Sequence, residues 1–222
     1  MKTIKANSAA DAWVKAILYL EEKGKKSSGL IEVLNLCIEI TNFFPDSGFD
    51  KKFRQIFGDE RIDFATSVTF IEPKKVFDKY VYKPMKGSYF ERMCKYRGEF
   101  NQIEHCIKVL KIGANVKRCE LMVYDPLKDA KRMFKQPCLL AIDLKPRGNY
   151  LYLTAFFRSQ RVSKSGYADY TALINLGDFL AGESDRELRK VTVIAASSHL
   201  SNQNKELDKS RRLLNAINTT TK

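Results

Sequence analysis

Two apolar runs separated by a short polar turn constrain the fold of this chain more than any other feature of its sequence. Residues Cys138–Leu144 and Tyr150–Phe157 are rich in the aliphatic and aromatic side chains that favour β-strands, and residues 145–149 between them include a proline and a glycine. We therefore expect two strands joined by a tight turn. In such a hairpin Cys138, at the start of the first strand, lies close to Arg158, which follows the second. A nucleophilic thiol beside a cation that binds phosphate indicates chemistry on a nucleotide.

The rest of the chain predicts helices mixed irregularly with strands. Ser8-Ala9-Ala10-Asp11 has the pattern of a capping box and predicts a helix through about Glu22. Residues 42–60 are expected to be irregular or briefly helical, and residues 126–132 to form a turn or short helix. Further helices are expected over Phe100–Lys111, Tyr167–Leu180 and Asn202–Ile217, and strands over Leu30–Thr41, Arg118–Tyr124 and Val191–Ala196. We expect one α+β domain spanning residues 1–222, with a mixed or antiparallel β-sheet flanked by helices.

The strong positive charge indicates an anionic partner. The 222 residues include 39 Lys and Arg against 26 Asp and Glu, which gives a formal net charge of +13. Such a field favours polyanions and speeds encounters with phosphorylated small molecules. Nucleic acid is the less favoured partner, because the sequence has no glycine-rich RNA motif, zinc finger or concentrated basic arm.

Several classes of protein are not favoured by this sequence. No stretch approaches the ~18–20 apolar residues of a membrane span, and residues 1–5 do not resemble a signal peptide, so we expect a cytoplasmic protein. We also expect no metal site, because the chain has only two histidines and no Cys-x-x-Cys spacing. Its five cysteines are Cys37, Cys94, Cys106, Cys119 and Cys138.

Five short motifs in the second half of the chain follow one another in a specific order. They are Lys117-Arg118, Tyr124-Asp125-Pro126-x-x-Asp129, Pro137-Cys138-Leu139, Arg158-Ser159 and Ser198-His199-Leu200. In this order and spacing they resemble the thymidylate synthase family, which includes the pyrimidine-nucleotide hydroxymethylases. Glu32-Val33-Leu34-Asn35, followed by a branched strand, is similar to the archaeal-type and hydroxymethylase branch. The resemblance implies a thymidylate synthase-type fold that forms a homodimer through its sheet.

The resemblance also implies the central chemistry. Cys138 would add to C6 of a pyrimidine ring, so that C5 becomes nucleophilic and can attack a one-carbon electrophile. A thiolate is needed for this addition, and a neighbouring guanidinium lowers the pKa of a thiol. Arg158 would therefore both bind the nucleotide phosphate and activate Cys138. The region that holds the family's catalytic glutamate aligns poorly. Glu72, in Phe70-Ile71-Glu72-Pro73, is the best candidate for protonating the base, and an ordinary surface glutamate is the alternative.

The resemblance assigns further residues to the nucleotide. Ser159 would add a hydroxyl to the phosphate site, and Lys117 and Arg118 would reach the phosphate from the partner subunit. Lys25 or Lys26, on the loop before the first long strand, would be another phosphate ligand. His199 would orient the ribose or an ordered water.

Base selectivity would depend on the residue eleven positions after Arg158. This residue is Asp169, where uracil-specific members of the family have Asn. A carboxylate accepts from the amino group of cytosine, so cytosine is favoured over uracil. An alignment with a two-residue gap would place Tyr167 there instead, and a helix-dipole role for Asp169 is the alternative without a ligand.

Three departures concern the folate half of the implied site. Arg161 stands where the family has an acidic residue that positions folate, Ser201 stands where a tyrosine binds the sugar, and a charged helix replaces the closing C-terminal segment. We therefore expect an enzyme that transfers a methyl or hydroxymethyl group to C5 of cytidine monophosphate rather than dUMP, with methylenetetrahydrofolate as the implied donor. The alternatives are a protein that binds nucleotides without folate chemistry, and a basic nucleic-acid-binding module.

Overall fold

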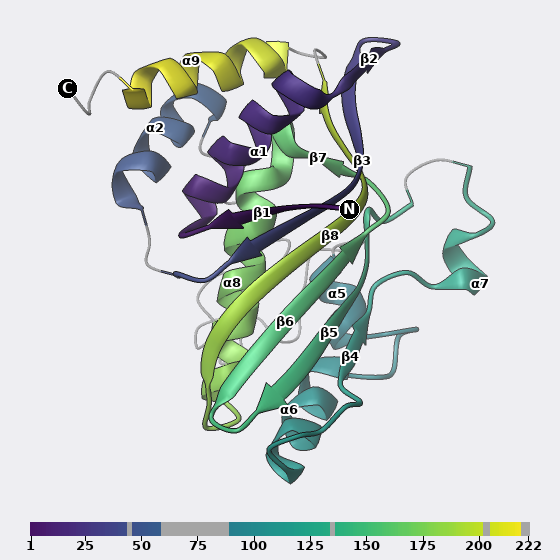
Figure 1. The fold of residues 1–222 in the computed structure, drawn as a ribbon. Helices are drawn as coiled ribbons and strands as arrows, with labels where there is room; N and C mark the ends of the chain where they lie inside the picture. The colour runs from purple at the N-terminus through teal and green to yellow at the C-terminus, as the bar shows by residue number, and fades with distance from the viewer. Residues whose placement is uncertain (44–45, 59–88, 134–135, 202–204, 219–222) are drawn as a thin grey trace.

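A mixed, eight-stranded β-sheet is the centre of the computed structural model, which describes residues 1–43, 46–58, 89–133, 136–201 and 205–218 (Figure 1). The strand order is β1-β3-β8-β6-β5-β4, while β2 pairs with β3 and β7 with β8. The strands are β1 (Lys2–Ala6), β2 (Lys25–Ser27), β3 (Leu30–Ile40), β4 (Glu120–Met122), β5 (Leu139–Arg147), β6 (Tyr150–Phe157), β7 (Gln160–Arg161) and β8 (Glu187–Ser201).

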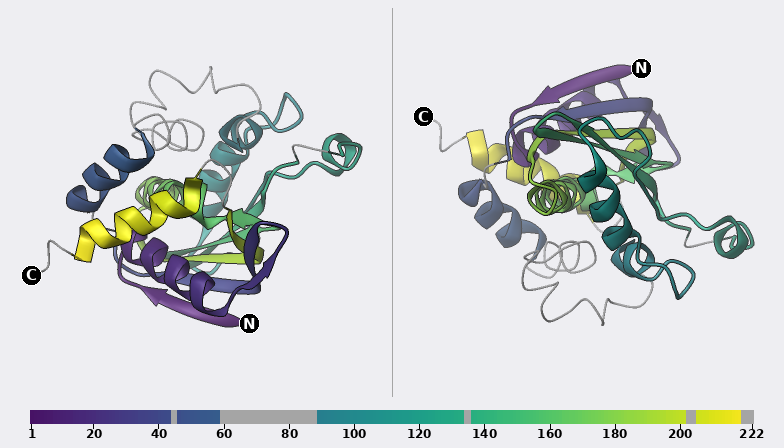
Figure 2. Two further views of the ribbon diagram at one scale, coloured as in Figure 1. Left: turned by 90° about the horizontal axis from the view of Figure 1, so that it is seen from above. Right: turned by 90° about the horizontal axis from the view of Figure 1, so that it is seen from below.

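The described helices other than α7 cover one face of this sheet and leave the other uncovered, while α7 projects from the side of the sheet (Figures 1 and 2). The described helices are α1 (Ala9–Lys23), α2 (Ser47–Phe57), α5 (Tyr89–Cys94), α6 (Gln102–Ile112), α7 (Pro126–Asp129), the π-helical turn η2 (Val162–Gly166), α8 (Tyr167–Gly182) and α9 (Glu206–Asn218). In the described part of the chain, no helix is both long and apolar enough to cross a membrane.

The first helix begins where the sequence predicts. The Ser8 side chain accepts a hydrogen bond from the Asp11 amide, and the Asp11 carboxylate accepts one from the Asn7 amide. The apolar stripe of α1 is fully buried, and the indole N–H of Trp13 donates to the Val162 carbonyl over 3.0 Å. This bond ties α1 to η2, the turn that leads into α8.

Aromatic side chains attach α2 to this core. Phe49, Phe53 and Phe57 recur every four residues, so one face of the helix carries all three, and each ring lies within 6.3 Å of Trp13, centroid to centroid. Tyr167 completes the cluster, with its ring 4.8 Å from Phe49. The expectation of a brief helix within residues 42–60 is therefore confirmed as a three-turn helix.

The predicted hairpin is present, with a tighter turn than expected. β5 and β6 pair antiparallel from Leu139 opposite Phe157 to Arg147 opposite Tyr150. Only two residues, Gly148 and Asn149, remain in the turn, and Gly148 adopts a positive φ of 58° that favours glycine. Strand β5 therefore continues three residues beyond the predicted end.

The alternation of buried and less buried residues shifts by one position partway along β8, beside irregularities in the neighbouring strands. In β8 the residues Val191, Val193 and Ala195 are buried, but the next buried residues are Ser198 and Leu200. In a regular strand every second residue would be buried, so the buried residues would all have odd numbers here. Next to this part of β8 lie Asn35 of β3, whose φ is +56°, and the break between β6 and β7 at residues 158–159. This change of phase lies where the candidate site residues of β7 and β8 begin.

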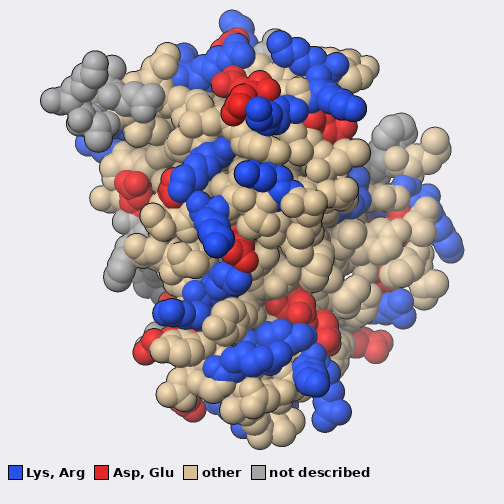
Figure 3. Space-filling view, viewed as in Figure 1, with Lys and Arg blue, Asp and Glu red and all other residues tan. Residues whose placement is uncertain are grey.

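The uncovered face of the sheet carries charged side chains together with exposed aromatic ones, among them Tyr150 and Phe156 of β6. Lys190 and Thr192 of β8 point away from the buried Val191, and Lys190 forms a 2.7 Å ion pair with Glu39 of β3. Figure 3 shows this face, with several groups of Lys and Arg side chains interspersed with carboxylates. The expected α+β class with a mixed sheet flanked by helices is confirmed for the described residues. Dimerisation through the sheet, and a single domain over residues 1–222, stay predictions.

Candidate active site

The hairpin places Cys138 and Arg158 together, as the sequence predicts. Because Leu139 pairs with Phe157, the residues just outside the two strand ends are neighbours, and the Arg158 amide donates to the Cys138 carbonyl over 2.9 Å. The Arg158 Nη2 atom lies 4.0 Å from the Cys138 sulfur. Two further bonds hold the guanidinium, from Nε to the Pro137 carbonyl (2.9 Å) and from Nη2 to the Gln136 carbonyl (3.0 Å).

A pocket of about 380 Å³ opens beside this sulfur. Four of the predicted site residues line it, namely Cys138, Ser159, Asp169 and His199. Tyr89, Phe157, Gln160, Arg161 and Ser165 complete the lining. Residues from α5, the β5–β6 hairpin, β7, η2, α8 and β8 thus converge on one cavity. Within the described residues, no cluster of three or more His, Cys, Asp or Glu side chains is placed to hold a metal ion.

Tyr89 is a site residue that the sequence did not single out for a role. Its hydroxyl oxygen accepts a 3.1 Å hydrogen bond from the Cys138 amide, 49 positions along the chain. Burial raises the pKa of Tyr89, and the nearby Asp169 and Cys138 raise it further, so the phenol keeps its proton at neutral pH. A neutral hydroxyl next to the nucleophile can both donate and accept a hydrogen bond.

Opposing effects act on the thiol. Burial raises the pKa of Cys138 above its ordinary value, and Asp169 adds to that shift. Arg158, the hydrogen bond with Tyr89, and Arg161 lower the pKa of Cys138 but do not outweigh burial. The predicted effect of Arg158 is therefore present, yet the free pocket favours the protonated thiol.

Asp169 lies among polar side chains on the first turn of α8. Its Oδ2 accepts a hydrogen bond from Gln160 Nε2 over 3.3 Å, and the Gln160 carbonyl oxygen in turn accepts one from the Tyr170 hydroxyl over 3.2 Å. Burial raises the pKa of Asp169 to about 7, although Gln160 and Ser165 act against the shift. The carboxyl is therefore close to half protonated at neutral pH, which suits a residue that exchanges hydrogen bonds with a ligand.

His199 lies in a row of charged residues that crosses four strands. Arg161 of β7 and Glu32 of β3 are its direct neighbours in the sheet, and Lys25 of β2 is paired with Glu32. Directly paired residues carry their side chains on the same side of a sheet. Burial and Arg161 lower the pKa of His199, while Glu32 raises it. The net lowering favours a neutral imidazole at neutral pH.

Arg161 occupies the place where the resemblance implies an acidic residue for folate. Its Nη1 lies 3.8 Å from Oε1 of Glu206, a fully buried carboxylate at the start of α9. Ser163 Oγ donates to the second oxygen of the same carboxylate over 3.5 Å. A guanidinium only donates hydrogen bonds, so it cannot replace an acceptor. The described residues of the pocket therefore do not provide the folate contact that the family pattern implies.

Lys117 and Arg118 lie far from the sulfur in the same chain. The Lys117 carbonyl accepts a hydrogen bond from Lys145 Nζ, and Lys145 is seven residues along the hairpin strand from Cys138. At about 3.3 Å per residue, this is roughly 20 Å. Both side chains are exposed and neither lines the pocket.

Arg158 lies beside the Cys138 sulfur without itself lining the pocket, and Lys25 is a further predicted residue outside the lining. Lys25 is exposed and lies two strands away from His199, about 10 Å at the usual strand spacing. Glu72, the candidate for protonating the base, lies outside the described residues.

The acidic residues of the motif Tyr124-Asp125-Pro126-x-x-Asp129 have a structural role. Asp125 caps α7 by accepting from the Leu127 amide. The fully buried Asp129 accepts two hydrogen bonds from the Arg92 guanidinium, over 2.5 and 2.9 Å, and one from the Asp125 amide. Gln136 Nε2 donates to the Asp129 carbonyl, so this network also contacts a residue two positions before Cys138.

Comparison with known proteins agrees with the motifs. No protein-family model matches the chain. A "putative thymidylate synthase" of Methanosarcina mazei is 24% identical over 204 residues, which cover 90% of this chain and 89% of the relative. The protein of the same name from Methanothermobacter thermautotrophicus is 23% identical over 210 residues, covering 89% of this chain and 92% of the relative. The chain is thus a distant homologue, over nearly its full length, of these archaeal proteins.

Proposed function

We propose that this protein is a transferase that adds a methyl or hydroxymethyl group to C5 of a pyrimidine nucleoside monophosphate through a covalent adduct of Cys138. The observation that carries the proposal is the Cys138 sulfur at the edge of a pocket, 4.0 Å from a guanidinium suited to phosphate. The full-length homology to proteins named for thymidylate synthesis supports the same class of reaction.

The chemistry requires the thiolate of Cys138. Its sulfur forms a bond to C6 while the electron pair of the C5=C6 double bond moves to C5 and the adjoining carbonyl or imine. C5 then takes either a proton or the carbon of a one-carbon electrophile, whose leaving group departs with its bonding electrons. Water would supply the oxygen of a hydroxymethyl product, whereas a methyl product would need a hydride donor in addition. Loss of the original C5 proton and expulsion of the thiolate restore the double bond. Addition and release of a proton alone exchange the C5 hydrogen with water, and need no second substrate.

The phosphate would be held on the hairpin. Arg158 is fixed by two backbone carbonyls, so little conformational entropy is lost when it binds an anion. Ser159 adds a hydroxyl from the pocket wall. Lys117 and Arg118 lie about 20 Å along the sheet from Cys138, which is too far for them to reach the phosphate in the same chain. Their predicted role therefore requires the partner subunit of a homodimer. Lys25 would approach from β2.

Asp169 would select the base. Its neutral carboxyl can donate to N3 of cytosine and accept from the amino group, while the ionised form still accepts from the amino group. Uracil presents its O4 acceptor at the same place, which opposes an ionised carboxylate. Cytidine monophosphate is therefore preferred over dUMP, and His199 would contact the ribose or a water molecule.

The identity of the one-carbon donor is a separate matter. Methylenetetrahydrofolate is the donor typical of the family, and when bound it supplies the one-carbon electrophile. Because Arg161 replaces the acidic contact, we derive no step through folate. This same replacement favours a second candidate function, in which the protein binds the nucleotide and does not transfer a one-carbon unit.

Release of tritium from C5-labelled dCMP, CMP and dUMP, with and without methylenetetrahydrofolate, separates these functions. The transferase proposal predicts release from a cytidine nucleotide that is lost in Cys138→Ser. Release that needs no folate would establish the thiol addition alone. If the nucleotide binds and none of the three releases tritium under either condition, the binding function is correct and the transferase proposal is wrong.

A further inference from the structure

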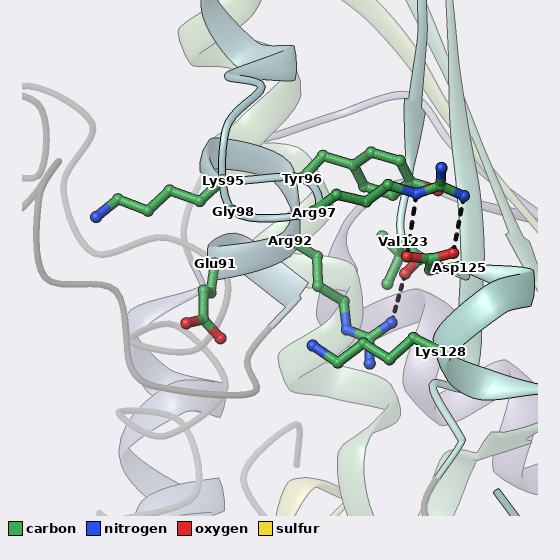
Figure 4. A pocket seen from close by; sticks show the side chains of 9 residues that line it. All are labelled: Glu91, Arg92, Lys95, Tyr96, Arg97, Gly98, Val123, Asp125 and Lys128. Atoms are coloured by element: carbon green, nitrogen blue, oxygen red, sulfur yellow. Dashed lines mark hydrogen bonds and ion pairs between the residues drawn. The ribbon is translucent and has the colours of Figure 1, made fainter. Parts of the chain in front are cut away.

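A second pocket, of about 450 Å³, lies among α5, the turn that follows it and α7 (Figure 4). This volume is in the range of small-molecule sites. None of its lining residues lines the pocket around Cys138. The two cavities nevertheless share α5. Its first residue, Tyr89, bonds to the Cys138 amide, and Glu91 and Arg92 of the same turn line the second pocket.

Basic side chains predominate in this second pocket. Its positively charged lining residues are Arg92, Lys95, Arg97 and Lys128, and its negatively charged ones are Glu91 and Asp125. The wall remains positive even when Asp129, which lies behind Arg92, is counted with the acids. Neither Lys95 nor Lys128 forms an ion pair with any described residue. Two ammonium groups are therefore available to compensate a ligand.

Both guanidinium groups are fixed in place. Arg97 donates from Nη2 and Nε to the two oxygens of Asp125, over 3.1 and 3.3 Å, and lies 5.6 Å from the centre of the Tyr96 ring. Arg92 donates to Asp129 and to the Val123 carbonyl, the latter over 2.8 Å. Figure 4 shows Lys128 extending from α7 in the direction of Arg92, while Lys95 points outward at the rim. The donors thus come from α5, from the turn that follows it and from α7. The two guanidinium groups among them are already held in place before any ligand binds.

We propose that this second pocket binds a phosphorylated small molecule. A phosphate group carries close to two negative charges and several acceptor oxygens, which match the cationic donors of this wall. A carboxylate offers only two acceptor oxygens to these donors, fewer than a phosphate group offers. The Tyr96 ring supplies an apolar surface for the organic part of the ligand. This site goes beyond the proposed function and does not depend on it.

The test uses pyrophosphate as the probe and calorimetry on the full-length protein at about 0.15 M salt, where long-range attraction is largely screened. We expect a dissociation constant at or below about 1 mM. Arg158→Gln, which removes the guanidinium beside Cys138, should leave this constant within about twofold. The double variant Lys95→Glu/Lys128→Glu should weaken pyrophosphate binding at least about tenfold, because both attractions become repulsions.

A matched control carries the same change of charge elsewhere. Lys108→Glu/Lys111→Glu alters two exposed lysines of α6 that line neither pocket, and should retain the wild-type constant within about threefold. Equal losses in the two double variants would overturn the proposal, as would loss in Arg158→Gln alone or no binding at all. Binding of dCMP, which tests the proposed function, is measured in a separate titration. If one of the two ligands does not bind, the result for the other ligand can still be interpreted.

Discussion

The sulfur of Cys138 lies 4.0 Å from Nη2 of Arg158, at the open end of the β5–β6 hairpin. The guanidinium is held there by the carbonyls of Pro137 and Gln136, without any ligand. One edge of the group is therefore committed to the backbone, whereas Nη1 forms no hydrogen bond with the described part of the chain and can bind an anion. The same fixed cation acts on the pKa of the thiol. Phosphate binding and thiol activation would thus depend on one side chain.

Substitution of Arg158 should weaken the binding of nucleotides and not of nucleosides. Arg158→Gln removes hydrogen bonds to a charged group, which contribute about 1.5–3 kcal/mol, so the dissociation constant for dCMP should rise about 10- to 100-fold. Deoxycytidine, which lacks the phosphate, should bind the variant as it binds the wild type. Calorimetry gives both constants. Arg147→Gln, an exposed arginine at the other end of the hairpin, is the control, and equal losses for dCMP and deoxycytidine would contradict the role of Arg158.

The same substitution should slow alkylation of Cys138. Arg158 lowers the pKa of this thiol, so its removal should raise the pKa further and leave less thiolate at a given pH. The rate of reaction with iodoacetamide, followed by mass spectrometry of the peptide that contains Cys138, should shift to higher pH than in Arg147→Gln. The other four cysteines are buried and should react more slowly. An unchanged pH profile would show that Arg158 does not act on the sulfur.

Asp169→Asn should change which base is preferred. The amide can donate to O4 of uracil and accept from its N3–H, whereas the carboxyl suits cytosine. A correct hydrogen-bond pair contributes about 1–3 kcal/mol, so the ratio of dCMP to dUMP affinity should fall roughly 5- to 150-fold. Competition binding measures the ratio directly. If the ratio stays constant, Asp169 does not read the base, and Tyr167 becomes the residue to test.

Asp169 should also make the stability of the protein depend on pH. Burial raises the pKa of Asp169 from 3.8 to about 7, so the folded state binds this proton more tightly than the unfolded chain. Between these two values the folded state holds more protons, and the contribution of Asp169 to stability therefore falls as pH rises. Asp169→Asn removes this dependence. Its stability relative to the wild type should increase from pH 4 to pH 7 and then level off, as measured by urea unfolding. A difference that does not change with pH would contradict the raised pKa.

The pair Arg92–Asp129 should be important for stability. Asp129 is fully buried and accepts two bonds from Arg92, so Asp129→Asn leaves a guanidinium without its counter-charge. Breaking a buried pair costs about 3–5 kcal/mol. Glu22→Gln, which breaks an exposed pair with Lys23, should cost less than about 1 kcal/mol. Urea unfolding compares the two, and equal costs would mean that the Arg92–Asp129 pair is not a stabilising element.

Local pattern predicts much of this fold. The hairpin, α1 and α6 each carry their signal within a dozen residues, in alternating apolar runs, a capping residue or helical spacing. β1 was missed because Lys2–Ala6 is short and half polar, and it becomes a strand only by pairing parallel with β3. The helix α2 was expected only in part, although Asp46 and the four-residue spacing of its phenylalanines are a readable signal.

The candidate site shows the same division. Cys138 and Arg158 are close in sequence through the hairpin, so their contact was predictable. The bond between Tyr89 and Cys138 joins distant segments, and a tyrosine at the start of a short helix carries no sign of it. Likewise, Arg161 was identified as a departure from the family pattern, but its buried partner Glu206 depends on where α9 packs. Such contacts are decided by tertiary packing.

The most direct test of the central claim is a crystal structure of the protein soaked with dCMP. We predict the phosphate on the Arg158 guanidinium, the cytosine ring in the pocket with C6 within bonding or van der Waals distance of the Cys138 sulfur, and the amino edge toward Asp169. A nucleotide bound with its ring away from that sulfur, or a pocket that stays empty while the nucleotide occupies another site, would contradict the account.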